Sequence, residues 1–144
     1  MKVRDCMTRE FRIVGPGETI QGAAHTMAEI DAGFLPVAEG ERLVGIITDR
    51  DIAIRAVAIG LAPSAKVSEV MSGEVRYCFA DEDAADVLDT MADLQLRRLP
   101  VVDRDQRLVG VISITDLAGN GEAAHAGEAL GEIARPSGYH SQII

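Results

Sequence analysis

The chain has 144 residues, of which 47% are hydrophobic and 3% aromatic. This length fits one domain or two very small ones, and it is sufficient for a core that needs no disulfide or metal. A formal net charge of −9 excludes nucleic acid and anionic membrane surfaces as partners, because both require a basic face. With two cysteines, a polar N-terminus and no long apolar stretch, we expect a cytoplasmic protein.

The chain is a tandem repeat. A shift of 64 residues aligns Met7 with Met71 and Leu35-Pro36-Val37 with Leu99-Pro100-Val101. One further residue falls in a polar turn, after which a shift of 65 aligns Arg42–Gly45 with Arg107–Gly110 and Asp51 with Asp116. We therefore predict repeats at 1–64 and 65–120, followed by a C-terminal helix and loose tail at 121–144.

Each repeat predicts the order strand–helix–strand–strand–helix, and hence a mixed α/β (α+β) fold. In the first repeat, an apolar patch at 11–14 and a polar start at Glu18-Thr19 precede a helical stripe from Ile20 to Ile30. Strands at 34–37 and 43–48 and a helix at 49–60 follow. The second repeat predicts these elements at 75–79, 84–94, 99–102 and 108–113, with a last helix that is interrupted at 119–121 and resumes at 122–134; from Pro136 onward we expect the tail.

The second strand of each repeat, with the residues that follow it, forms a motif. It reads Leu43-Val44-Gly45-Ile46-Ile47-Thr48-Asp49-Arg50-Asp51-Ile52 in the first repeat. In the second, Arg98-Leu99-Pro100-Val101-Val102-Asp103 leads to Leu108-Val109-Gly110-Val111-Ile112-Ser113-Ile114-Thr115-Asp116-Leu117. These blocks resemble the signature of the CBS domain, named for cystathionine β-synthase. Over about residues 1–120 the chain resembles a CBS pair, or Bateman module, of the small stand-alone bacterial kind typified by hypoxic response proteins.

The resemblance implies a fold, a ligand class and an assembly. CBS pairs pack their motifs about a pseudo-twofold axis and leave two clefts for adenine nucleotides or other adenosyl ligands, such as AMP, ADP, ATP, NAD or S-adenosylmethionine. We therefore expect a non-enzymatic regulatory sensor with no required cofactor, no catalytic or metal-binding residues, and a homodimeric state. The resemblance also implies a crossed arrangement, in which the N-terminal segment of one motif faces the other motif's site.

Hydroxyl and carboxylate side chains at the strand-to-helix junctions suit such a ligand. Thr48 and Asp51 form one pair, and Ser113 and Asp116 form the other. A carboxylate can accept both hydroxyls of a ribose diol, and a Ser or Thr hydroxyl can donate to a ribose or phosphate oxygen. We also expect the N–H groups that begin the following helix to favour phosphate.

The surrounding strand residues complete the expected site. Gly45 and Gly110 should leave room for the ligand, while four apolar residues, Ile46, Ile47, Val111 and Ile112, should form a dry wall for a purine. In the crossed arrangement, the segment from Met71 to Arg76, together with Leu96 and Arg97, would close a cleft.

Cations for a phosphate are scarce. Arg97 and Arg98 are the first candidates, since CBS domains often carry a basic residue there, and Arg50 and Arg55 are second choices. The positions that match Arg97 and Arg98 in the first repeat are Gly33-Phe34, without charge. This asymmetry predicts unequal sites, one of which accepts a multiply charged ligand.

Plainer roles for the same side chains stay open. Asp51 and Asp116 also fit the role of helix caps. Arg97 and Arg98 also fit the role of surface charges or of partners for nearby aspartates at a dimer interface.

Two other functions stay open as well. A ligand-free scaffold for dimerisation and protein interaction would fill the clefts with its own side chains, such as Phe34, Met71 or Arg97. A metal- or redox-responsive stress protein would use Cys6 and Cys78, although the scattered histidines lack metal-ligand spacing. No nucleophile–base set and no phosphate-binding glycine loop predicts catalysis.

Overall fold

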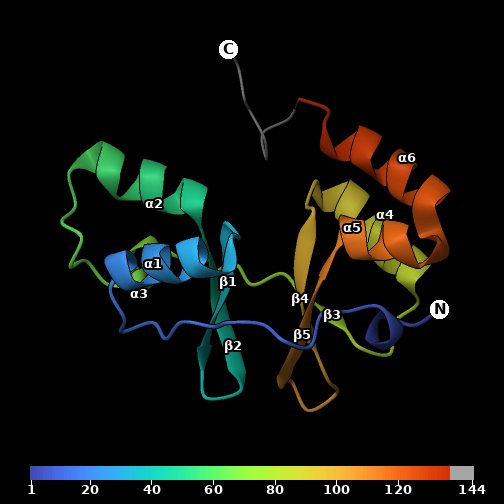
Figure 1. Ribbon diagram of the computed structural model, residues 1–144, viewed down its shortest axis with the longest axis horizontal. Helices are drawn as coiled ribbons and strands as arrows, with labels where there is room; N and C mark the ends of the chain where they lie inside the picture. Colours follow the sequence, from blue (N-terminus) through green and yellow to red (C-terminus); the bar gives the residue numbers. More distant parts are fainter. Residues whose placement is uncertain (137–144) are drawn as a thin grey trace. The chain divides into compact units, whose positions relative to one another are not determined.

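The computed structural model describes residues 1–136, which form two compact units (Figure 1). The first-repeat unit spans residues 12–75, and the second-repeat unit combines residues 1–11 with the chain from Arg76 onward. These units do not coincide with the sequence repeats, because each repeat gives its first residues to the unit of the other. The predicted boundary at 64/65 thus marks the duplication in sequence, while the compact units are divided at 11/12 and 75/76.

The first-repeat unit packs three helices beside a two-stranded antiparallel hairpin. Thr19 starts the first helix as predicted, since its Oγ1 accepts the Gly22 N–H at 3.1 Å. The apolar patch at 11–14 forms only a bridge, Val14 beside Val37, in place of the predicted strand. The elements are α1 (Ile20–Ile30), β1 (Phe34–Glu39), β2 (Arg42–Thr48), α2 (Asp49–Arg55), the 3-10 turn η2 (Val57–Ile59) and α3 (Val67–Val70).

The second-repeat unit has the corresponding hairpin plus a short parallel strand at its edge. The predicted helix interruption is confirmed, because Asn120 and Gly121 leave the helical conformation at φ −110 and φ 102. Residues 137–144 of the predicted tail lie outside the described residues. The elements are η1 (Val3–Asp5), β3 (Cys78–Phe79), α4 (Ala84–Leu94), β4 (Arg98–Val102), β5 (Leu108–Ser113), α5 (Ile114–Leu117), the π-turn η3 (Ala118–Glu122) and α6 (Ala123–Ile133).

Each unit has its own apolar core between its hairpin and its helices. Leu35 and Ile47 pack with α1 in the first-repeat unit, and Leu99 and Ile112 pack with α4 in the second; all four are 0% exposed. Burying each such side chain stabilises the fold by about 1.5–3 kcal/mol. No helix within residues 1–136 combines the length and the apolar composition needed to traverse a bilayer.

The exchange of N-terminal segments is held by backbone hydrogen bonds on each second strand. In the second-repeat unit the Thr8 N–H donates to the Val111 carbonyl at 2.8 Å, and the Val111 N–H donates back to the Thr8 carbonyl at 3.0 Å. Ser72 and Ile46 form the same reciprocal pair in the first-repeat unit, at 2.9 and 3.2 Å. The structure therefore agrees with the crossed chain path that the resemblance implies.

The exchanged segments also correct the role expected of two glycines. A Cβ on Gly110 would lie 2.7 Å from Met7 Sδ and 3.0 Å from the Thr8 carbonyl oxygen. A Cβ on Gly45 would meet Met71 Sδ and the Ser72 carbonyl oxygen at the same two distances. The space beside each glycine is therefore filled by a methionine and a backbone strand of the protein itself, and it is not room left for a ligand.

Candidate functional site

Ser113 and Asp116 form a reciprocal cap at the start of α5. The Asp116 N–H donates to Ser113 Oγ at 3.0 Å, and the Ser113 N–H donates to Asp116 Oδ2 at 3.0 Å. The Ser113 hydroxyl still carries a proton that it can donate, and a carboxylate has about four acceptor positions. Within residues 1–136, no hydrogen bond or ion pair to a protein group engages Asp116 Oδ1. The cap thus leaves one donor and one carboxylate oxygen for a ligand.

Thr48 and Asp51 repeat this geometry at the start of α2. The Asp51 N–H donates to Thr48 Oγ1 at 3.1 Å, and the Thr48 N–H donates to Asp51 Oδ2 at 3.0 Å. The interpretation of both aspartates as helix caps is therefore correct, although capping does not prevent ligand binding. One difference is that Arg55 Nε lies 3.9 Å from Asp51 Oδ1, whereas Asp116 has no such neighbour among the described ion pairs.

The strand partners of the two hydroxyls differ in chemistry. Phe34 lies directly opposite Thr48 in the first hairpin, and Arg98 lies directly opposite Ser113 in the second. Opposed residues of an antiparallel pair project to the same face, with Cβ atoms about 4.5–5.5 Å apart. The first hydroxyl therefore has a phenylalanine as its cross-strand neighbour, and the second has an arginine. We call these two neighbourhoods the first rim and the second rim.

Strand alternation corrects the expected apolar wall. Ile47 and Ile112 are 0% exposed and belong to the unit cores, on the strand face opposite to Thr48 and Ser113. Ile46 and Val111 lie two residues before the hydroxyls, and so share their face. Of the four residues expected to contact a purine, only these two lie on the face that carries the rims.

One residue beyond each pair of strand partners, a backbone hydrogen bond joins the start of the first strand to the start of the following helix. In the first rim the Asp49 N–H donates to the Gly33 carbonyl at 3.0 Å, and in the second the Ile114 N–H donates to the Arg97 carbonyl at 2.9 Å. The backbone is thus the same in both rims while the side chains differ. These bonds and the caps occupy N–H groups at both helix starts, and α5 has only four residues, so the expected phosphate attraction by the helix termini lacks support.

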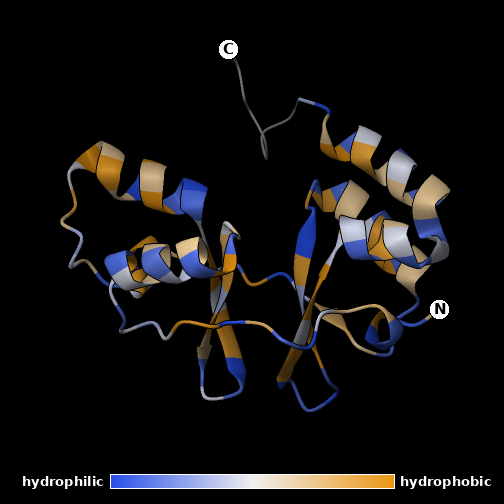
Figure 2. Cartoon of the chain, viewed as in Figure 1, coloured by the Kyte–Doolittle hydropathy of each residue, from blue (hydrophilic) through white to orange (hydrophobic). Residues whose placement is uncertain are grey.

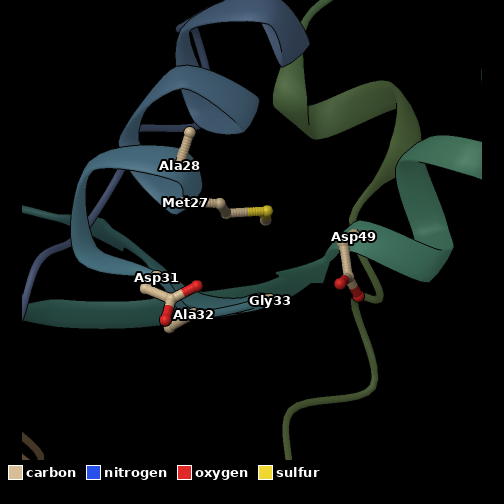
Figure 3. Close-up of a pocket in the computed structure, with 6 residues that line it drawn as sticks. All are labelled: Met27, Ala28, Asp31, Ala32, Gly33 and Asp49. Atoms are coloured by element: carbon tan, nitrogen blue, oxygen red, sulfur yellow. The ribbon is translucent and has the colours of Figure 1, made fainter.

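An open hollow of about 250 Å³ lies beside the first rim. The side chains of Asp31 and Asp49 stand on either side of it, and Met27 reaches between them (Figure 3). Ala28, Ala32 and Gly33 complete the lining. The sequence offered Asp49 only as part of the motif, and its place over Gly33 was missed; the available signal was its mismatch with Ile114 between otherwise similar repeats.

The remaining predicted site residues are Leu96, Arg97, Arg98 and Arg76, all in the second-repeat unit. Leu96 is partly buried against the core of the second-repeat unit, and the exposed residues Arg97 and Arg98 follow it. The structure thus brings Arg97 and Arg98 next to Ser113 and Ile114, and Leu96 packs against the core instead. Arg76 begins the second stretch of the second-repeat unit, directly after the chain leaves the first-repeat unit, and its role at a rim stays a prediction.

The two cysteines are buried side chains of the second-repeat unit. Cys6 Sγ donates to the Val3 carbonyl at 3.6 Å, and Cys78 Sγ donates to the Pro100 carbonyl at 3.8 Å. Desolvation raises the pKa of the Cys6 thiol and raises that of Cys78 to about 12. A protonated, buried thiol is a poor nucleophile and metal ligand. Among the described residues, no three His, Cys, Asp or Glu side chains are grouped to hold a metal ion.

Comparison with known proteins gives a family match. The model of the CBS domain matches residues 3–57 and 67–121. The chain is 42% identical over 132 residues to the CBS domain-containing protein YhcV of Bacillus subtilis, covering 91% of this chain and 94% of YhcV. It is 38% identical over 117 residues to hypoxic response protein 1 of Mycobacterium tuberculosis, covering 80% of this chain and 81% of that protein.

Solved structures show the same fold with different occupants. Hypoxic Response Protein I with two coordinated zinc ions matches with a TM-score of 0.76 and 37% identity, over 83% of this chain and 98% of that one. The CBS domain pair of MJ0100, in complex with 5′-methylthioadenosine and S-adenosyl-L-methionine, matches with a TM-score of 0.74 and 28% identity over 83% and 98%. The cytosolic domain of the Mg²⁺ channel MgtE in complex with ATP matches with a TM-score of 0.72 and 27% identity, over 83% and 48%.

Proposed function

The chain belongs to the CBS domain family, and we propose that it is a non-enzymatic regulatory module that binds an adenine nucleotide or another adenosyl ligand. The observation that carries this proposal is the second rim, where an available hydroxyl and carboxylate oxygen adjoin two exposed arginines. The adenosyl ligands and ATP held by the matching CBS structures support the choice of ligand class.

Different residues of the second rim contact different parts of the ligand. Asp116 Oδ1 accepts hydrogen bonds from the ribose hydroxyls, and the Ser113 hydroxyl donates to a ribose or phosphate oxygen. Arg98, which lies opposite Ser113, and Arg97, which precedes it, neutralise the phosphate. Val111 supplies an apolar surface on the same strand face. Occupancy would then favour the conformation with the ordered rim, so that ligand level sets how the module meets its partner.

Calorimetry against AMP, ADP, ATP, NAD and S-adenosylmethionine tests this function. We expect at least one ligand to bind, and Asp116→Ala to weaken binding of the phosphorylated ligand roughly tenfold to 100-fold, as for loss of a charged hydrogen-bond partner. Asp51→Ala should weaken it less, because the arginines are in the second rim. Asp86→Ala, which removes an exposed charge of α4 away from the rim, is the control. If no ligand binds at millimolar concentration, the proposed function is wrong.

A scaffold for self-association is the second candidate, and it is favoured by one surface. Ile54, Val57 and Ile59, on α2 and η2, are 47%, 70% and 69% exposed, and much of this part of the ribbon has the orange of hydrophobic residues in Figure 2. Neighbouring exposed apolar residues of this kind are typical of an interface. We therefore propose a homodimer, and sedimentation equilibrium of the wild type and Val57→Glu tests it. The cytoplasmic location and a stress-response role stay predictions.

A further inference from the structure

We propose that Asp49 is a specificity-determining residue, which excludes phosphate from the first rim and restricts it to uncharged adenosyl ligands, while the second rim takes the phosphorylated ones. This inference rests on the proposed function and assigns a ligand charge to each rim. It depends on the residues that occupy matched backbone positions in the two units.

The matched backbone makes the side chains of the two rims directly comparable. Residues 33 and 49 are joined by the same backbone hydrogen bond as residues 97 and 114, at 3.0 and 2.9 Å. Residues 34 and 48 are strand partners in the same register as residues 98 and 113. Charge differences between the rims therefore come from side chains placed on equivalent backbone.

The Asp49 carboxylate occupies the place where the second rim begins its arginine. A Cβ built on Gly33 would lie 2.6 Å from Asp49 Cγ and 2.8 Å from Oδ1, and still closer to Oδ2. The Arg50 N–H donates to Asp49 Oδ1 at 2.8 Å and helps to hold the carboxylate there. In the second rim, Arg97 takes the place of Gly33 and Ile114 takes the place of Asp49, and there is room for the Cβ of Arg97 beside Ile114. A phosphate near residue 97 thus has an arginine within reach, whereas a phosphate near residue 33 has a carboxylate beside it.

The other charges near the rims strengthen this difference. Asp31 adds a second carboxylate to the hollow beside the first rim. Its counterpart Gln95 instead donates from Nε2 to the carbonyl of Glu132, in the last turn of α6, and to that of Arg135, just after the helix, at 2.9 and 2.8 Å. Arg55 lies 3.9 Å from Asp51 and offsets that carboxylate. Counting Asp31, Asp49, Asp51, Arg50 and Arg55, the first rim carries one net negative charge. Arg97, Arg98 and Asp116 give the second rim one net positive charge.

The uncharged parts of the first rim still suit an adenosyl group. Thr48 and Asp51 keep the hydroxyl and carboxylate of the ribose site, and Phe34 and Ile46 lie on the same strand face. An aromatic ring beside a ribose-binding pair provides a stacking surface for a purine. Adenosine and 5′-methylthioadenosine offer the first rim the same ribose and purine as AMP, but they carry no phosphate.

Calorimetry with AMP and 5′-methylthioadenosine tests the inference on the full chain. We expect one AMP and two 5′-methylthioadenosine molecules per chain in the wild type, with AMP affinity lowered roughly tenfold to 100-fold in Asp116→Ala and kept in Asp51→Ala. Asp49→Asn, which keeps an acceptor for the Arg50 N–H, should add a second AMP site or raise AMP affinity of the first rim at least tenfold, with 5′-methylthioadenosine unchanged. Asp49→Glu, which keeps the charge, should behave as the wild type.

The outcomes separate this inference from the proposed function. Two AMP molecules per chain in the wild type, or no effect of Asp49→Asn on AMP stoichiometry and affinity, would overturn the inference and leave the proposed function standing. Absence of binding of both ligands would overturn both. Circular dichroism melts of the Asp49 variants confirm that each is folded before its binding is compared.

Discussion

One added methyl group at Gly110 tests whether the exchanged N-terminal segment packs on β5. In Gly110→Ala the new Cβ would lie 2.7 Å from Met7 Sδ and 3.0 Å from the Thr8 carbonyl oxygen, against an optimal separation of about 3.5–4.0 Å. Met7 is only 9% exposed, and Thr8 is tied to Val111 by two backbone hydrogen bonds, so neither can move freely.

The expected magnitude is the difference between two opposing effects. Overpacking a filled site costs about 1–3 kcal/mol, while replacing glycine by alanine restricts the unfolded chain and contributes about 0.4–1 kcal/mol of stability. We therefore expect Gly110→Ala to lower the free energy of unfolding by roughly 0–2.6 kcal/mol, with the middle of that range at about 1.3 kcal/mol. Urea denaturation followed by circular dichroism measures it.

Two further variants make the result specific to the contact. Gly127→Ala, in α6 where a Cβ would meet no atom within 4 Å, should instead stabilise the protein by about 0.5–1 kcal/mol. Gly110→Ala should cost less stability in a Met7→Ala background than in the wild type, because the sulfur that it would meet is gone. We expect a coupling free energy of about 0.5 kcal/mol or more in this double-mutant cycle. If Gly110→Ala is more stable than the wild type, or if the two changes are additive, the segment does not pack as described.

Two other predictions concern titratable groups of the second-repeat unit. His125 Nε2 on α6 lies 2.7 Å from Asp89 Oδ1 on α4, and this hydrogen bond raises the pKa of His125 above 6.5. Because the pKa of His125 is higher in the folded than in the unfolded protein, its stabilisation is complete below the unfolded pKa and is lost as the pH rises through the folded pKa. The urea midpoints of the wild type and His125→Gln should therefore converge at alkaline pH. A difference between the midpoints that does not change with pH would contradict this. Burial and raised pKa values predict that Cys6 and Cys78 react with a thiol reagent at neutral pH only once urea unfolds the protein, and rapid labelling of the native protein would disprove it.

Local sequence patterns predicted α1, α4 and both hairpins, but α3 at Val67–Val70 was not predicted, and the helix expected at 49–60 ends at Arg55 before the turn η2. The apolar spacing from Ile20 to Ile30 gives the observed bounds of α1, and the glycines at 119–121 mark the observed break before α6. Capping by Asp116 was one of the two roles that the sequence left open, because a cap needs only residues three apart and its hydrogen bonds are local. These elements depend on neighbours in the chain, which is why the sequence alone was informative.

Features that depend on which face a residue takes could not be predicted from the sequence. The run from Leu43 to Ile47 is apolar without alternation, so nothing in it distinguishes the core face from the rim face. Only the observed register places Ile47 inside and Ile46 beside Thr48. The role of Gly110 was missed for a related reason, because the atoms that need its missing side chain come from Met7, about a hundred residues away.

The pattern of identity between the repeats now separates structure from specificity. Met7 and Met71 are identical because each fills the space over a glycine, and that requirement is the same in both units. At the rims the requirement differs between the units: Asp49 leaves no room for a Cβ at residue 33, whereas Ile114 leaves room for Arg97 on the matched backbone. A pair of positions that can change together without disturbing the backbone is a place where a duplicated module can acquire two ligand preferences. The fold does not require the charge difference between the rims. This difference is therefore what would select between charged and uncharged ligands.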